Sequence, residues 1–162
     1  MQLIGYYEST FVRRVAITLM LYDMAFEHRP VPTSNRAAVE PFSPLGRIPA
    51  LVLDDGETLI DSTMIVDHLD LLAPPDRALT PRSGPERRAV NRIVAIAMGT
   101  GDKYVSAYYE STKRPESHVW GPWLDRLEEQ VQNGLRYLDD ALAKAPGGRY
   151  FVGDRPKRVF QH

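Results

Sequence analysis

The 162-residue sequence contains no cysteine. This absence excludes disulfide bonds, a Cys-X-X-Cys redox centre and thiolate metal sites, and it makes a thioredoxin-like redox protein a weak interpretation. The four histidines show no spacing typical of a metal site, so we expect no bound metal. A chain without cysteine is compatible with the cytoplasm, where we expect this protein to act.

The sequence also lacks a long apolar run and an excess of charge of either sign. No apolar run approaches the about 18 residues that a membrane-spanning helix needs. The N-terminus has neither the basic region nor the long apolar region of a signal peptide. Lysine and arginine total 20 against 21 aspartates and glutamates, a formal net charge of −1. We therefore expect no membrane partner and no nucleic-acid partner.

Strand-like and helix-like segments alternate over the first 75 residues. Apolar and alternating runs predict strands at residues 3–7, 26–31, 50–53 and 58–60. Apolar residues at helical spacing predict a helix over residues 11–21 and another from Asp61 or Ser62 to about Leu72. A short, weak helix or a loop is expected at residues 35–42. This order is that of a thioredoxin-like α/β domain, with the first two strands parallel and the last two antiparallel.

The rest of the chain predicts a different kind of domain. Residues 76–85 contain the helix and strand breakers Pro81, Gly84 and Pro85, which predicts a linker. After them, apolar residues recur at helical spacing over residues 86–110 and 120–144, which predicts two long helices. The sequence therefore predicts an α/β domain at residues 1–75, followed by an all-helical domain at residues 86–162.

Three short motifs stand at the junctions between these elements. Ser9-Thr10 precedes the first helix, Gly46-Arg47-Ile48-Pro49 enters the third strand, and Asp61-Ser62 begins the next helix. Each motif alone has a plain structural explanation. The first and third would be helix caps, Arg47 a solvated loop cation, and Pro49 an ordinary trans residue at a strand edge.

Taken together, the three motifs resemble the glutathione site of the glutathione transferase family, in its bacterial, Ser-type or zeta-like form. The resemblance covers nearly the whole chain and is strongest over residues 1–75. It implies that the peptide bond before Pro49 is cis and that Ile48 offers its backbone groups to the cysteine of glutathione. It also implies that Asp61 and Ser62 hold the γ-glutamyl end, while Arg47 reaches the glycine carboxylate.

The same resemblance gives Ser9 the contact with the glutathione sulfur. A free thiol titrates near pH 8.5 and reacts as the thiolate. A hydroxyl donor at a helix N-terminus stabilises that thiolate, so Ser9 would act as a hydrogen-bond donor rather than as a nucleophile. Thr10 stands where the family more often has proline, and it remains open whether Ser9 or Thr10 contacts the sulfur.

The resemblance implies a glutathione transferase, in which the thiol of the co-substrate glutathione attacks a small electrophile. It also implies a role in detoxification and a homodimeric state. Tyr7, Tyr104 and Tyr108 are candidates for the wall of the electrophile pocket, with core or subunit packing as the alternative for the two helical tyrosines. The reaction type stays open between conjugation, isomerisation and peroxide reduction. The alternative is a non-catalytic module that binds glutathione or a protein partner.

The C-terminal end departs most from the family pattern. After Arg149–Pro156 the family continues with a capped, buried helix, whereas here six residues follow without a capping box. We expect a truncated helical domain, with only Val159 and Phe160 apolar among the last six residues, and therefore incompletely covered apolar faces on the two long helices.

Overall fold

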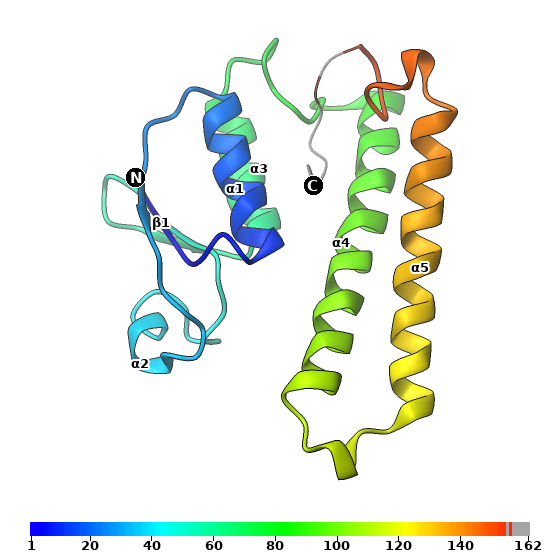
Figure 1. Ribbon diagram of the computed structural model, residues 1–162. Helices are drawn as coiled ribbons and strands as arrows, with labels where there is room; N and C mark the ends of the chain where they lie inside the picture. Colours follow the sequence, from blue (N-terminus) through cyan, green and yellow to red (C-terminus); the bar gives the residue numbers. More distant parts are fainter. Residues whose placement is uncertain (155, 157–162) are drawn as a thin grey trace. The chain divides into compact units, whose positions relative to one another are not determined.

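The computed structural model describes residues 1–154 and 156 (Figure 1). The chain divides into two compact units, the first Met1–Leu79 and the second beginning at Thr80. Val159 and Phe160 lie outside the described residues. The first unit contains β1 (Gln2–Ile4), α1 (Thr10–Leu21), β2 (Glu27–Arg29), α2 (Arg36–Val39), β3 (Ala50–Val52), β4 (Thr58–Ile60) and α3 (Ser62–Leu72).

The four strands form one sheet in the order β2-β1-β3-β4. β1 pairs with β2 in parallel, whereas β3 pairs with β1 and β4 antiparallel. This topology confirms the thioredoxin-like arrangement predicted from the order of the elements. The first strand is shorter than the predicted residues 3–7, because Gly5 adopts φ +128° and the chain leaves the sheet after Ile4.

Successive residues of the central strands serve two separate hydrophobic cores. Leu3 and Leu51 pack on the face of the sheet that α1 and α3 cover, and Figure 1 shows these two helices side by side. Ile4 and Ala50 belong to the opposite face, in the smaller core that includes Val39 of α2. Because side chains alternate along a strand, burial on both faces fixes the register of the sheet and hence the place of the loops at its ends.

A buried polar contact joins the end of the first unit to its helices. The hydroxyl of Tyr22, just after α1, donates a hydrogen bond to Asp70 of α3 and accepts one from the backbone N–H of Leu79 at 2.7 Å. Tyr22 and Asp70 are both buried. This contact fixes the segment that leaves α3 and leads into the second unit.

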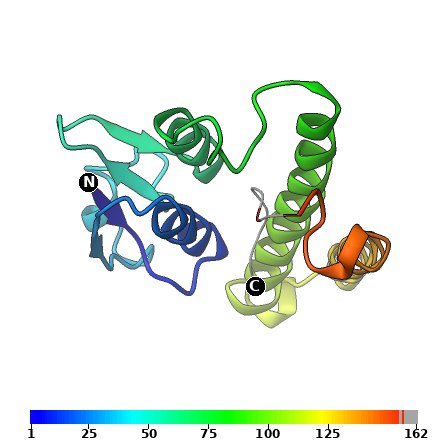
Figure 2. The same ribbon diagram turned by 90° about the horizontal axis from the view of Figure 1, so that it is seen from above.

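The second unit is an antiparallel pair of long helices, which Figure 1 shows along their length and Figure 2 from above. It contains α4 (Gly84–Thr112), the short helix η1 (Glu116–His118), α5 (Gly121–Ala143) and the short helix η2 (Pro146–Gly148). Ile93 and Ala97 of α4 pack with Leu138 of α5 to form its small core. Within the described ranges, no helix is both long enough and apolar enough to cross a membrane.

Candidate functional site

The register of the sheet brings the three predicted motifs together at one end of its strands. Ile4, Ala50 and Ile60 are aligned across β1, β3 and β4. The next position along each strand is therefore Gly5, Pro49 and Asp61, which lie in one row at the end of the sheet. The loop to Ser9 starts from this row, so the residues of all three motifs converge although they are spread over more than 50 positions of sequence.

Gly5 permits the close approach of two of these segments. A Cβ atom at this position would lie 2.7 Å from Cγ2 of Val12 and 2.9 Å from Cβ of Ile48. Its φ of +128° also belongs to a region that residues with side chains rarely adopt. Glycine therefore lets the first turn of α1 and the loop before β3 pack against the same stretch of backbone.

Ser9 is the N-cap of α1, with extended backbone angles. Its Oγ accepts a hydrogen bond from the backbone N–H of Val12 at 3.4 Å, and the residue is half-buried. Capping uses only an acceptor lone pair, so the hydroxyl hydrogen can still be donated to another group. Thr10 is the first residue of the helix, and its side chain is also half-buried.

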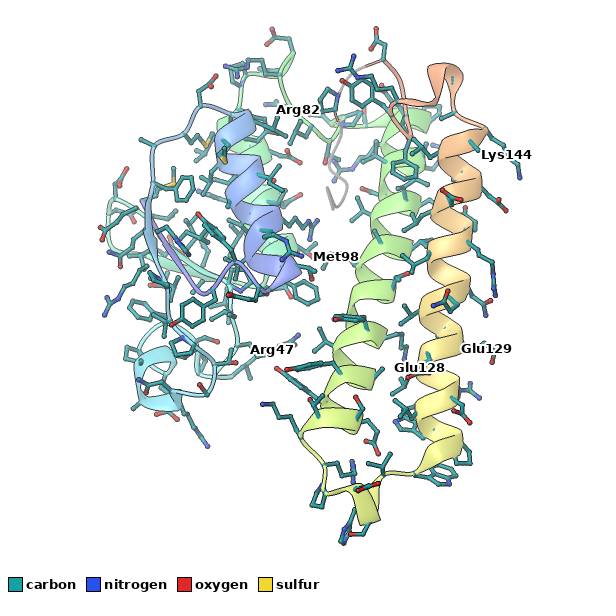
Figure 3. All side chains as sticks on the ribbon, viewed as in Figure 1. Arg47, Arg82, Met98, Glu128, Glu129 and Lys144 are labelled. Carbon is teal, nitrogen blue, oxygen red and sulfur yellow. The ribbon has the colours of Figure 1, made fainter. Side chains whose placement is uncertain are left out.

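The Ile48–Pro49 peptide bond is cis, as the resemblance implied. Pro49 is buried and Ile48 is half-buried between the two cores of the first unit. Arg47 is exposed and extends from the loop that precedes β3, as Figure 3 shows. The backbone N–H of Arg47 donates to Oγ of Ser43 at 3.4 Å, which holds this loop against the end of α2.

Asp61 and Ser62 form the start of α3. Asp61 is the N-cap, adopts φ +66° and accepts the backbone N–H of Thr63 at 2.7 Å through its carboxylate. Its side chain is exposed, whereas Ser62 is buried. Negative groups are stabilised at a helix N-terminus, so this corner suits both the capping carboxylate and an anionic ligand.

Arg14 is a member of this corner that the sequence analysis missed. It lies on α1, is only 5% exposed, and donates from Nη1 to Oγ of Ser62 at 3.2 Å and to Oγ1 of Thr63 at 3.4 Å. Buried arginines are rare unless they are paired. An arginine beside the apolar stripe of the predicted helix was the signal that could have revealed it.

The loop between β1 and α1 is braced from β2 and from α1. Nε2 of His28 donates to the backbone oxygen of Gly5 at 2.7 Å, which assigns the ring hydrogen to that nitrogen. The ring of Tyr7 stacks on His28, with centroids 3.9 Å apart and planes at 14°. Arg13 donates to the backbone oxygen of Tyr7 at 2.6 Å. These contacts hold the loop that carries Ser9.

The other tyrosines proposed for an electrophile pocket belong to the second unit. Tyr104 and Tyr108 lie on α4, where their side chains are 56% and 47% exposed. Their exposure argues against the packing of these side chains in the core of the helical pair. Whether they meet the electrophile stays a prediction. In the part of the chain that the structure describes, no three His, Asp or Glu side chains gather into a metal-binding group.

Comparison with known proteins identifies one family for this chain. Residues 3–77 match the family model described as "Glutathione S-transferase, N-terminal domain". The chain is 33% identical over 145 residues to the uncharacterized GST-like protein YibF of Escherichia coli, which covers 88% of this chain and 70% of that protein.

Two further matches carry functional names. A maleylacetoacetate isomerase of Pseudomonas aeruginosa is 37% identical over 105 residues, which span 61% of this chain and 49% of that protein. A glutathione S-transferase from Methylobacillus flagellatus, solved with GSH bound, superposes with a TM-score of 0.87 at 30% identity. That superposition covers 97% of this chain and 76% of the other.

Proposed function

The chain belongs to the glutathione S-transferase family, and on that premise we propose that it binds glutathione and activates the thiol for attack on a small electrophile. The observation that carries the proposal is the convergence of Ser9, Ile48–Pro49 and Asp61-Ser62 at one end of the sheet, where Arg14 of α1 also bonds to Ser62. The related structure solved with GSH bound supports the same ligand.

In the proposed complex, glutathione lies at the end of the sheet, along the loops that carry Ser9, Ile48 and Asp61. Ile48 offers backbone N–H and C=O to the cysteine of glutathione, in the manner of strand addition. Ser62 and the first amides of α3 face the γ-glutamyl carboxylate, and Asp61 faces the γ-glutamyl ammonium group. Arg47, which is exposed on its loop, supplies a cation for the glycine carboxylate.

The proposed chemistry is stabilisation of a thiolate. Oγ of Ser9 accepts from Val12 and donates its hydrogen to the sulfur, while the N-terminus of α1 adds a favourable potential. Lowering the thiol pKa by about two units requires roughly 2.7 kcal/mol of differential interaction. The thiol proton leaves to solvent, and the sulfur lone pair then forms the C–S bond with the electrophile.

The fate of that adduct distinguishes two reactions. In conjugation the adduct is the product, and a leaving group departs where the electrophile carries one. In isomerisation the thiolate adds to a double bond and is expelled again after rotation about the resulting single bond. The similarity to an enzyme named maleylacetoacetate isomerase supports the second reaction as an alternative to the first.

The proposal is tested first with the unmodified protein. We expect retention on immobilised glutathione and turnover of a generic aromatic electrophile such as 1-chloro-2,4-dinitrobenzene. Retention without turnover of this electrophile, or of an unsaturated substrate offered for isomerisation, would instead favour the non-catalytic binding module. Failure of both retention and turnover would contradict the glutathione site itself.

The role of Ser9 is tested with two substitutions that separate capping from thiol activation. Ser9→Ala removes both the cap and the donor, whereas Ser9→Asp keeps a good N-cap but cannot donate to sulfur. We expect both variants to lose about 10- to 100-fold in turnover, which corresponds to roughly 1.4–2.7 kcal/mol. Only Ser9→Ala should also lose about 1 kcal/mol of stability.

The measurements are the pH titration of thiolate absorbance, the turnover rate and thermal melting. Thr10→Val is the matched control, because it removes the neighbouring hydroxyl without touching the cap. If Ser9→Ala leaves the thiol pKa and the rate unchanged while Thr10→Val lowers the rate, the donor is Thr10 and not Ser9.

We also propose that the protein works in the cytoplasm, as a homodimer, in the disposal of electrophiles. The family resemblance supports each of these statements.

A further inference from the structure

A groove of about 450 Å³ lies in the second unit, beside the start of α5. Its walls come from α4, from α5 and from the residue that precedes α5. They are Lys103, Trp120, Pro122, Trp123, Arg126 and Gln130. None of these residues belongs to the proposed glutathione site, so the groove calls for a separate explanation.

Two aromatic side chains of the groove are unusually open to solvent. Trp120 is 65% exposed and Trp123 is 39% exposed. Indole rings bury a large apolar area when they find a partner, and their faces stack on planar groups. Two neighbouring exposed tryptophans therefore mark a surface suited to a flat, apolar ligand.

Two cations that pair with no carboxylate among the described residues line the same groove. Neither Lys103 nor Arg126 forms an ion pair with any residue in the described part of the chain. Elsewhere on the molecule, arginines such as Arg36 and Arg114 are paired with carboxylates four residues away. The groove thus combines apolar faces with two cationic groups whose donors are not taken up by a carboxylate of the described chain, and such groups can pair with an anionic ligand.

Gln130 contributes a polar group that lacks a partner. Its Oε1 is buried, and no hydrogen bond to it is made by any described residue. A buried amide oxygen without a partner is costly, and such groups are usually satisfied by water or by a ligand. A polar substituent on a molecule bound in the groove would supply the missing partner.

We propose that this groove binds a small aromatic carboxylate. The ring lies against Trp120 and Trp123, and the carboxylate pairs with Lys103 and Arg126. Lys103 and Arg126 would repel an organic cation, and a neutral ring of equal size would gain only the apolar contact. This site does not rest on the proposed transferase function, because no residue or step of that reaction takes part in it.

The chain provides its own reporter for the test. It contains two tryptophans in all, and both line the groove. Emission excited at 295 nm therefore reports on this surface without interference from other sites. We would titrate the full chain with 4-phenylbutanoate, and in parallel with its neutral amide, 4-phenylbutanamide, neither of which absorbs at that wavelength.

We expect a saturable change in tryptophan emission, with the carboxylate binding roughly tenfold more tightly than the amide. Rising salt concentration should reduce the difference in affinity between the carboxylate and the amide, because salt screens exposed charge pairs. Saturating glutathione should leave the titration unchanged. If glutathione displaced 4-phenylbutanoate, the carboxylate would be bound at the glutathione site, and the assignment to the groove would be wrong.

Matched variants test the two cations. Lys103→Gln and Arg126→Gln should each weaken carboxylate binding several-fold and leave amide binding unchanged. Lys144→Gln, at the far end of α5 (Figure 3), and Arg136→Gln, on the same helix outside the groove, are the controls and should bind like the unmodified protein. Equal binding of carboxylate and amide, or equal effects of all four variants, would contradict the proposal.

A second copy of the chain is the competing occupant. If it fills the groove, tryptophan emission will shift with protein concentration in the absence of ligand, and sedimentation will show the matching association. That result, like the absence of any saturable change up to the solubility of 4-phenylbutanoate, would overturn the ligand site.

Discussion

Asp61 has two tasks at the start of α3 in the proposed complex, and one substitution separates them. Asn is as good an N-cap as Asp and tolerates positive φ, so Asp61→Asn keeps the bond to the N–H of Thr63. It removes the negative charge that we assign to the γ-glutamyl ammonium group. We expect the Kd for glutathione to rise about tenfold, or about 1.4 kcal/mol, with thermal stability nearly unchanged.

Calorimetry of glutathione binding checks this expectation, with Asp55→Asn as the control. Asp55 is also an exposed aspartate that accepts a backbone N–H, that of Glu57 at 3.0 Å, but it lies in the turn between β3 and β4. Affinity equal to that of the unmodified protein in Asp61→Asn would remove Asp61 from the site.

Arg14 ties α1 to the beginning of α3 through two hydroxyl groups, those of Ser62 and Thr63. Lysine keeps the charge but lacks the planar fork that reaches both oxygens. We expect Arg14→Lys to destabilise the fold by about 1–3 kcal/mol, the usual range for a hydrogen bond to a charged group. Urea unfolding measures it, and Arg88→Lys on the exposed side of α4 is the control.

We also expect Arg14→Lys to weaken glutathione binding without changing the pKa of the bound thiol. The reason is that Arg14 orients Ser62 at one end of the ligand, whereas Ser9 acts at the sulfur. A changed thiol pKa with unchanged affinity would show that the arginine acts on α1 rather than on α3.

At the residue scale, the sequence revealed the motifs but not the contacts between them. Ser9, Pro49, Asp61 and Ser62 are visible because capping residues and proline have strong local preferences. Arg14 was not visible as a partner of Ser62, because the two are 48 positions apart and only the packing of α1 on α3 joins them.

At the scale of elements, helices and strand order were predictable and strand ends were not. The apolar periodicity of the two long helices gave their extents to within two residues of Gly84–Thr112 and Gly121–Ala143. Residues 5–7 look like strand, yet the chain turns away because Gly5 must make room for Val12 and Ile48. A close approach of this kind comes from tertiary packing.

The pairing of α4 with α5 depends on Gly134. A Cβ atom there would lie 1.9 Å from Oγ1 and 3.0 Å from Cβ of Thr100 on α4. Oγ1 of Thr100 is itself held by the backbone oxygen of Ile96 at 2.8 Å. Gly134→Ala should therefore destabilise the protein, although alanine is the better helix former by about 1 kcal/mol.

Gly99→Ala on α4 is the matched control, because nothing lies within 4 Å of the Cβ atom it would add. We expect it to stabilise the protein by about 0.5–1 kcal/mol, as helix propensity alone dictates. The double variant Gly134→Ala/Thr100→Ala should lose less stability than the two single changes added together. Additive losses, or a stabilising Gly134→Ala, would show that the helices do not meet closely at this point.

For the whole molecule, the two units carry several large apolar side chains that lie outside the three hydrophobic cores. Leu71 and Leu72 of α3 are 67% and 55% exposed, and Leu135 and Tyr137 of α5 are 38% and 42% exposed. Exposed apolar residues on several elements are common at subunit contacts. They agree with the homodimer that we propose on the family resemblance.

Dimerisation makes stability depend on protein concentration, because association favours the folded state by mass action. We expect sedimentation to show a dimer at micromolar concentration and the melting temperature to rise as the protein is concentrated. Leu71→Ser and Leu72→Ser should shift the equilibrium towards the monomer if α3 takes part, while Met20→Ser, an equally exposed change on α1, serves as the control. A protein that stays monomeric and stable at every concentration, and binds no hydrophobic dye, would show that these side chains need no cover.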